Sequence, residues 1–177
     1  DSSKREADIA IRILGEGGSP PEHLMGSKVA PIMVANYVAN AHAERIDPET
    51  HPTASRWLAF YDRNISEMLR EGSSYPHLPL WGAFASLEAI VPATQQGLGL
   101  ATLITYAADR SPGLMRLDKA DVRHVADIWV LCHPDLRENA RIRAVRQEVA
   151  AALRRNEDLF AGRSVVAPEG CAIEPQT

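Results

Sequence analysis

The residues best suited to acid–base or metal chemistry are six histidines, and they are scattered along the chain. No two stand four residues apart, and none has a carboxylate at the spacing that a metal-binding helix uses. His133 is followed by Pro134, which is typical of a hinge or surface position rather than of a general base. The sequence therefore predicts no metal site at its histidines, which are residues 23, 42, 51, 77, 124 and 133.

Motifs for nucleophilic catalysis and nucleotide binding are also missing from the sequence. There is no Gly-x-Ser-x-Gly segment, and no Ser, Cys or Lys stands in a recognisable nucleophile motif. Gly97 and Gly99 begin a pattern of the dinucleotide type, but Thr102 occupies the third glycine position. The order there is helix then strand, the reverse of what phosphate binding requires, so a helix end and tight turn explain these glycines. We expect no enzyme activity and no cofactor.

Ser86 is the polar residue with the clearest route to a ligand. It precedes an apolar segment that runs toward Gln96, and Glu88 stands in the first turn, so Ser86 can cap a helix. The free N–H groups and positive end of that helix would face whatever lies beyond the predicted strand over 80–84, which favours a carboxylate or other small anion. A plain N-cap without a ligand is the alternative, because nearly every helix start has a capping residue.

Composition and charge exclude several other classes of protein. The 177 residues are 45% hydrophobic and carry a formal charge of −4, which is the wrong sign for a chain that grips phosphate backbones. Two cysteines, Cys132 and Cys171, cannot build a disulfide framework and fit a reducing cytosol. No apolar segment approaches the roughly 20 residues that a membrane helix needs, and the first residues are polar where a secretory signal would be apolar. We expect a cytoplasmic protein with no membrane partner.

Short strands alternate with helices along the chain. A strand buried on at least one face is expected over 9–13, followed by a Gly/Pro-rich linker over 14–22. Strands are also predicted over 29–35, 57–61, 80–84, 98–106 and 127–133, and helices over 36–44 (capped by Asn36), 66–72, 86–96 and 139–160. Parallel neighbours need crossover connections, so this order predicts an α/β fold with a parallel or mixed sheet.

Two packing expectations follow from these elements. The terminal helix has Ile142, Val145 and Val149 at helical spacing, and we expect this face to pack against the strand over 9–13. Pro92 lies six residues beyond Ser86, so that helix should kink or start late.

Five blocks of the sequence together resemble the effector-binding domain of LysR-type bacterial transcriptional regulators. Their order and spacing match the family over about residues 6–162. The blocks are EADIAIRI (6–13), PPEHLMGSKVA (20–30), ASLEAIVPATQQGLGLA (85–101), PGLMRL (112–117) and IWVLCHPDLRENARIRAVRQEVAAAL (128–153).

The resemblance implies a type II periplasmic-binding-protein-like fold, with two lobes of mixed sheets and a small-molecule site between them. The first lobe would be incomplete, because the family's DNA-binding head, linker helix and first part of lobe one come before the strand that matches 9–13. Residues 1–14 and 133–163 would be the remnant of lobe one, 15–132 lobe two, and 164–177 a disordered tail.

The resemblance also implies a function and a set of site residues. The chain would be a ligand-sensing regulatory domain whose effector, expected to be an organic acid, modulates DNA binding by the missing head in a homo-oligomeric parent. The family places the cleft at residues matching Ile13, Leu14, Ala85 and Ser86, and we add Phe84, which precedes them on the strand. Ala85 stands where relatives often carry a polar residue. A solute-binding protein of the same fold that serves a transporter is the alternative.

Overall fold

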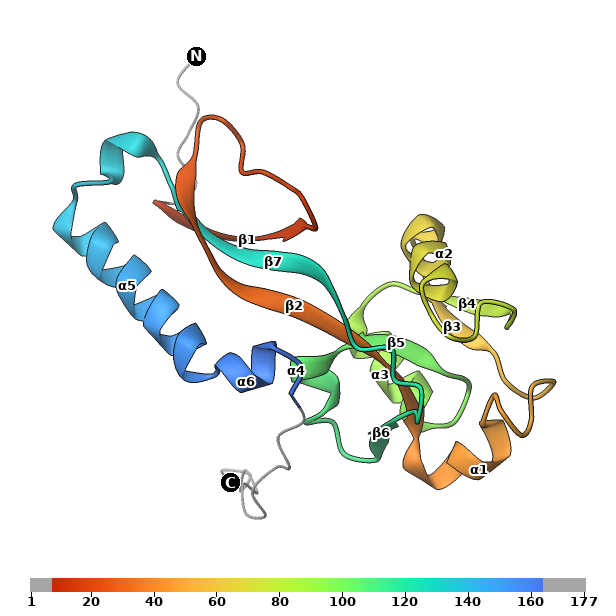
Figure 1. Ribbon diagram of the computed structural model, residues 1–177. Helices are drawn as coiled ribbons and strands as arrows, with labels where there is room; N and C mark the ends of the chain where they lie inside the picture. The colour runs from red at the N-terminus through yellow and green to blue at the C-terminus, as the bar shows by residue number, and fades with distance from the viewer. Residues whose placement is uncertain (1–7, 164–177) are drawn as a thin grey trace, which may run out of the picture.

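The computed structural model describes residues 8–163, so the tail expected over 164–177 lies outside the described residues (Figure 1). The strands are β1 (Ile9–Gly15), β2 (Met25–Ala39), β3 (Trp57–Phe60), β4 (Leu80–Phe84), β5 (Ala101–Ile104), β6 (Leu114–Arg116) and β7 (Arg123–Cys132). The helices are α1 (Ala43–Ile46), α2 (Arg63–Glu71), α3 (Leu87–Gln95), α4 (Thr105–Ala108), α5 (Ala140–Arg155) and α6 (Glu157–Phe160), with short 3-10 turns at Asn40–His42 and Pro134–Leu136.

Two long antiparallel strands, β2 and β7, form the centre of the larger sheet. Strand β1 pairs with the outer edge of β7, and β5 and β6 pair with β2, all antiparallel. Strands β3 and β4 form a separate parallel pair joined by α2, and Figure 1 shows both beside β5 at one end of the molecule. The expected mixed α/β architecture is therefore confirmed, although most of the pairing is antiparallel.

The expected helix capped by Asn36 is wrong, because β2 continues through this residue to Ala39. Asn36 is fully buried in the strand, and its side-chain oxygen accepts a hydrogen bond from Thr102 Oγ1 at 2.9 Å. Its amide nitrogen donates to Asp121 Oδ2 at 2.7 Å. Both polar atoms of the Asn36 side-chain amide therefore have hydrogen-bond partners inside the sheet. Asn36 gains nothing further from capping a helix.

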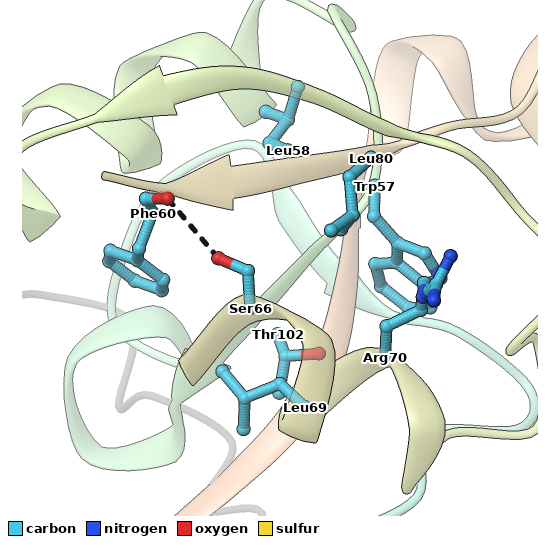
Figure 2. A pocket seen from close by; sticks show the side chains of 8 residues that line it. All are labelled: Trp57, Leu58, Phe60, Ser66, Leu69, Arg70, Leu80 and Thr102. Atoms are coloured by element: carbon cyan, nitrogen blue, oxygen red, sulfur yellow. Dashed lines mark hydrogen bonds between the residues drawn. The ribbon is translucent and has the colours of Figure 1, made fainter. Parts of the chain in front are cut away.

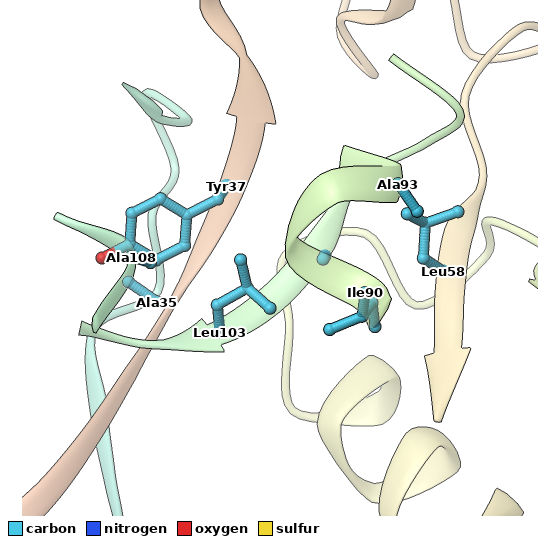
Figure 3. Close-up of a cluster of buried hydrophobic side chains, with 8 residues drawn as sticks. Ala35, Tyr37, Leu58, Ile90, Ala93, Leu103 and Ala108 are labelled. Carbon is cyan, nitrogen blue, oxygen red and sulfur yellow. The ribbon is translucent and has the colours of Figure 1, made fainter. Parts of the chain in front are cut away.

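Helix α3 packs against one face of the larger sheet, in the region that Figure 3 shows. Tyr37 and Leu103 from β2 and β5 gather with Ile90 of α3 in one buried cluster. The helix begins at Leu87, so the expected late start is wrong, and Pro92 lies inside it. A bend at Pro92 stays a prediction.

The expected burial of β1 and its packing against the terminal helix are wrong. Ile11 and Ile13 share one face of the edge strand β1 and are 60% and 57% exposed, because the described residues leave that face largely uncovered. Helix α5 lies along β2 and β7 instead, as Figure 1 shows, and Val145 is exposed. Leu153 and Phe160 pack beside a small buried cluster that contains Ala126.

Two glycines with similar backbone conformations provide a test of this packing. Gly97 follows α3 with φ +69°, and an added Cβ would lie 2.2 Å from the ring of His42. Gly113 has φ +77°, with no described atom within 4 Å of the added Cβ. Both alanine variants lose about 1 to 2 kcal/mol from the left-handed backbone, and the clash should cost Gly97→Ala about 1 to 3 kcal/mol more. Urea unfolding measures both, and equal losses would contradict the packing.

Candidate functional site

A cavity of about 530 Å³ lies between the larger sheet and the β3–α2–β4–α3 segment. Its volume is typical of small-molecule sites, and its walls are almost entirely apolar. The lining residues come from β1, β2, β5 and β7 on one side (Ile13, Ile32, Val34, Thr102, Ile104, Val125, Ala126) and from β3, α2, β4 and α3 on the other (Phe60, Tyr61, Asp62, Ile65, Met68, Leu69, Phe84, Ala85, Leu87).

The parallel strands β3 and β4 both end at this cavity. The Tyr61 N–H donates to the Phe84 carbonyl at 2.8 Å, which holds the two strand ends together. Helices α2 and α3 begin directly afterwards, so two helix N-termini adjoin the same hollow. Crevices outside the carboxyl ends of parallel strands are where α/β proteins generally bind ligands.

Helix α2 supplies an apolar wall of the cavity and is anchored by its N-cap. Asp62 caps the helix, since its Oδ1 accepts hydrogen bonds from the N–H groups of Asn64 and Ile65. Ile65, Met68 and Leu69 then follow at spacings of three and four, which places them on one helix face. Ile65 and Met68 are 46% and 56% exposed, so the cavity is open to solvent on this side.

A second, much smaller hollow lies between α2 and β3, as Figure 2 shows. Ser66 Oγ donates to the Phe60 carbonyl at 3.3 Å and ties the helix to the strand. The hollow is about 10 Å³, comparable with a single water, so it belongs to the packing of α2 rather than to a ligand site.

The structure brings three of the five expected site residues to the large cavity. Ile13, Phe84 and Ala85 line it, although β1 and β4 are far apart in sequence. Leu14 and Ser86, their neighbours in the chain, are not among the lining residues. Ser86 holds the expected N-cap position of α3, but its side chain makes no capping hydrogen bond to the backbone.

Sequence reasoning missed most of the cavity wall. The α2 residues carried a usable signal, because Asp62 precedes an apolar pattern at helical spacing. The expected helix began at 66 and so omitted Ile65. Thr102 carried no local signal, since its position beside Asn36 depends on how β5 pairs with β2.

The cavity's electrostatics are set by few polar groups. Asp62 is the one charged residue among the described lining residues. Thr102 is buried and donates its hydroxyl hydrogen to Asn36, which in turn donates to Asp121. Beside this wall, β7 carries a buried carboxylate, Asp127, within 2.9 Å of Lys28 Nζ and of His124 Nε2.

The pKa of the Asp127 carboxyl lies below its ordinary value. Burial raises that pKa, but the hydrogen bonds from Lys28 and His124 outweigh the effect of burial.

Within residues 8–163 no group of three or more His, Cys, Asp or Glu is arranged to hold a metal. None of the described helices has the length and apolarity to cross a membrane.

Comparisons with solved structures identify the fold. No protein-family model matches the sequence, and no curated protein does either. The effector domain of the transcriptional regulator AmpR of Pseudomonas aeruginosa is 17% identical, with a TM-score of 0.59 over 84% of this chain and 74% of that one. The regulatory domain of CrgA, a LysR-type transcriptional regulator from Neisseria meningitidis, is 16% identical, with a TM-score of 0.64 over 85% of this chain and 77% of that one.

The AmpR effector-binding domain from Citrobacter freundii is a third such structure, 14% identical with a TM-score of 0.62 over 84% of this chain and 75% of that one. The chain has the fold of these regulatory domains. The expectation of a type II periplasmic-binding-protein-like architecture is thereby confirmed.

The Asp127 cluster gives a pH-dependent prediction. A carboxyl whose folded pKa is lowered stabilises the fold above its unfolded pKa, about 4, and this stability is lost as the pH falls through the folded value. Asp127→Asn should therefore reduce the free energy of unfolding at pH 7 by about 1 to 3 kcal/mol and flatten its decline in acid.

Urea unfolding between pH 7 and pH 3 measures both effects, with Asp118→Asn at an exposed position as the control. The same acid slope for Asp127→Asn and wild type would contradict the assignment.

Proposed function

We propose that this chain is the ligand-sensing regulatory domain of a LysR-type transcription factor that works in the cytoplasm. The observation that carries the proposal is the apolar cavity of about 530 Å³ at the carboxyl ends of β3 and β4, in a chain with the fold of such regulatory domains. A small-molecule effector would bind there. No acid–base pair or nucleophile motif in the sequence favours catalysis instead.

The proposed effector contacts come from two parts of the chain. Ile13 belongs to the proposed remnant of lobe one (1–14 and 133–163), and Phe84 and Ala85 belong to the proposed lobe two (15–132). A ligand touching both parts would favour one relative placement of the lobes, to the extent that its affinity differs between placements. Leu14 and Ser86 would act beside these contacts rather than as cavity walls.

We propose that other segments of the parent protein carry out the response to effector binding. A net charge of −4 argues against DNA binding by these residues, so a separate DNA-binding head would carry that role. A homo-oligomeric parent would transmit the lobe movement to paired heads.

The sequence suggested an organic acid as the effector. Its acid group would have to lie at the first turn of α3, where Glu88 already stands. The proposal is therefore limited to a small molecule with an apolar body.

Cavity-blocking variants test the proposal with a panel of apolar small molecules. A binder present at a hundred times its Kd should raise the melting temperature of the chain by roughly 5 to 10 °C. Ala85→Trp places a large ring in the cavity and should abolish the rise. Ala83→Trp, at an exposed position on β4 outside the lining, should retain it.

Each variant is measured by thermal unfolding with and without compound, so its own stability serves as the baseline. A panel without any binder, or binders equally effective on Ala85→Trp, would contradict the proposed site.

A further inference from the structure

The large cavity has one charged group among its described lining residues. Of the described lining residues none is Lys, Arg or His, and the one charged group is the Asp62 carboxylate. An anion entering an apolar hollow loses hydration and needs cationic or N–H partners in exchange. The candidates for such partners are the N-termini of α2 and α3 and the hydroxyl of Thr102.

The N-terminus of α2 is already neutralised by its own cap. Asp62 Oδ1 lies 3.0 Å from the N–H nitrogen of Asn64 and 3.4 Å from that of Ile65. These are the N–H groups that would otherwise receive a ligand's carboxylate. A ligand anion at this position would have to displace the Asp62 carboxylate or lie next to it.

The N-terminus of α3 has an internal carboxylate as well. Hydrogen bonds from the Ser86 side chain and from the Glu88 backbone N–H lower the pKa of the Glu88 carboxyl, so the charged form lies at the first turn. Glu88 stands in the first turn of α3, which is where the sequence suggested a ligand anion.

Thr102 cannot replace these donors. Asp121 can only accept, so the Asn36 amide must donate to it, and the Asn36 oxygen must accept from Thr102. The direction of this chain of hydrogen bonds leaves Thr102 with acceptor capacity only. Among the described lining side chains, the other hydroxyl group is that of the exposed Tyr61.

We infer that the cavity of this chain selects an uncharged, largely apolar molecule and discriminates against anions. This inference rests on the proposed function, because it names the ligand class of the same site. It replaces the organic acid expected from the sequence. Asp62, which lines the cavity, is its specificity-determining residue, and the apolar wall supplies the affinity.

Two dyes with the same aromatic body provide the probe. Phenylnaphthylamine is neutral and carries an N–H donor, whereas anilinonaphthalenesulfonate adds a sulfonate. Fluorescence titration of the chain at low ionic strength should give a Kd at least about tenfold lower for the neutral dye, because the described lining offers the sulfonate one carboxylate and no cation. Ala85→Trp should abolish binding of the neutral dye, and Ala83→Trp should not.

Removing a carboxylate tests the cause of the selectivity. Asp62→Asn keeps a good N-cap and should lower the Kd of the anionic dye by about threefold. Glu71→Gln, at the exposed C-terminal end of α2 outside the lining, should leave that Kd unchanged.

The outcomes separate this inference from the proposed function. Equal or tighter binding of the anionic dye, lost in Ala85→Trp, would overturn the inference and leave the cavity as a binding site. An Asp62→Asn variant that behaves like Glu71→Gln would also overturn it. Binding of neither dye, or binding unaffected by Ala85→Trp, would overturn the site and the inference together.

Discussion

The antiparallel pairing of β2 with β7 is the constraint on which the rest of the structure depends. It joins Met25 to Cys132 at one end and Val34 to Arg123 at the other, with register shifts between residues 28 and 30 and between 32 and 33. Strand β1 uses the free edge of β7, β5 and β6 use that of β2, and α5 lies along both. This ladder therefore places residue 13 on β1 beside the apolar residues of β2, β5 and β7 that line the cavity.

The cavity forms where the β3–α2–β4 unit packs against the sheet that contains this ladder. The β3–α2–β4 unit is locally determined, with parallel strands and a capped helix, and its strand ends face the apolar side chains of β2, β5 and β7. Because Asp62 caps the N-terminus of α2 and lines the cavity, the mouth has a negative charge while the walls stay apolar. Shape and charge together favour an uncharged ligand.

The parts of the fold that sequence reasoning found are those with local signals. The strand over 57–61, the helix that ends at Gly72 and the helix that follows Ser86 all have caps or apolar runs within a few residues. The prediction that Asn36 caps a helix was wrong because its hydrogen-bond partners Thr102 and Asp121 lie 66 and 85 positions away in the sequence. For the site, the family resemblance led to Ile13, Phe84 and Ala85, while the α2 wall and Thr102 depend on docking that no short segment encodes. The exposure of Ile11 and Ile13 likewise depends on which strands lie beside β1, not on the alternation of residues within it.

The most direct measurement is the location of a bound neutral ligand by NMR. Methyl-labelled methionines report on two distinct hollows, because Met68 lines the large cavity and Met115 lines a separate one of about 170 Å³ beside Leu117 and Asp118. With phenylnaphthylamine bound, we expect intermolecular NOEs from the dye's aromatic protons to the Met68 methyl group and none to that of Met115. NOEs to Met115 without any to Met68 would contradict the claim that the cavity between the sheet and α2 is the ligand site.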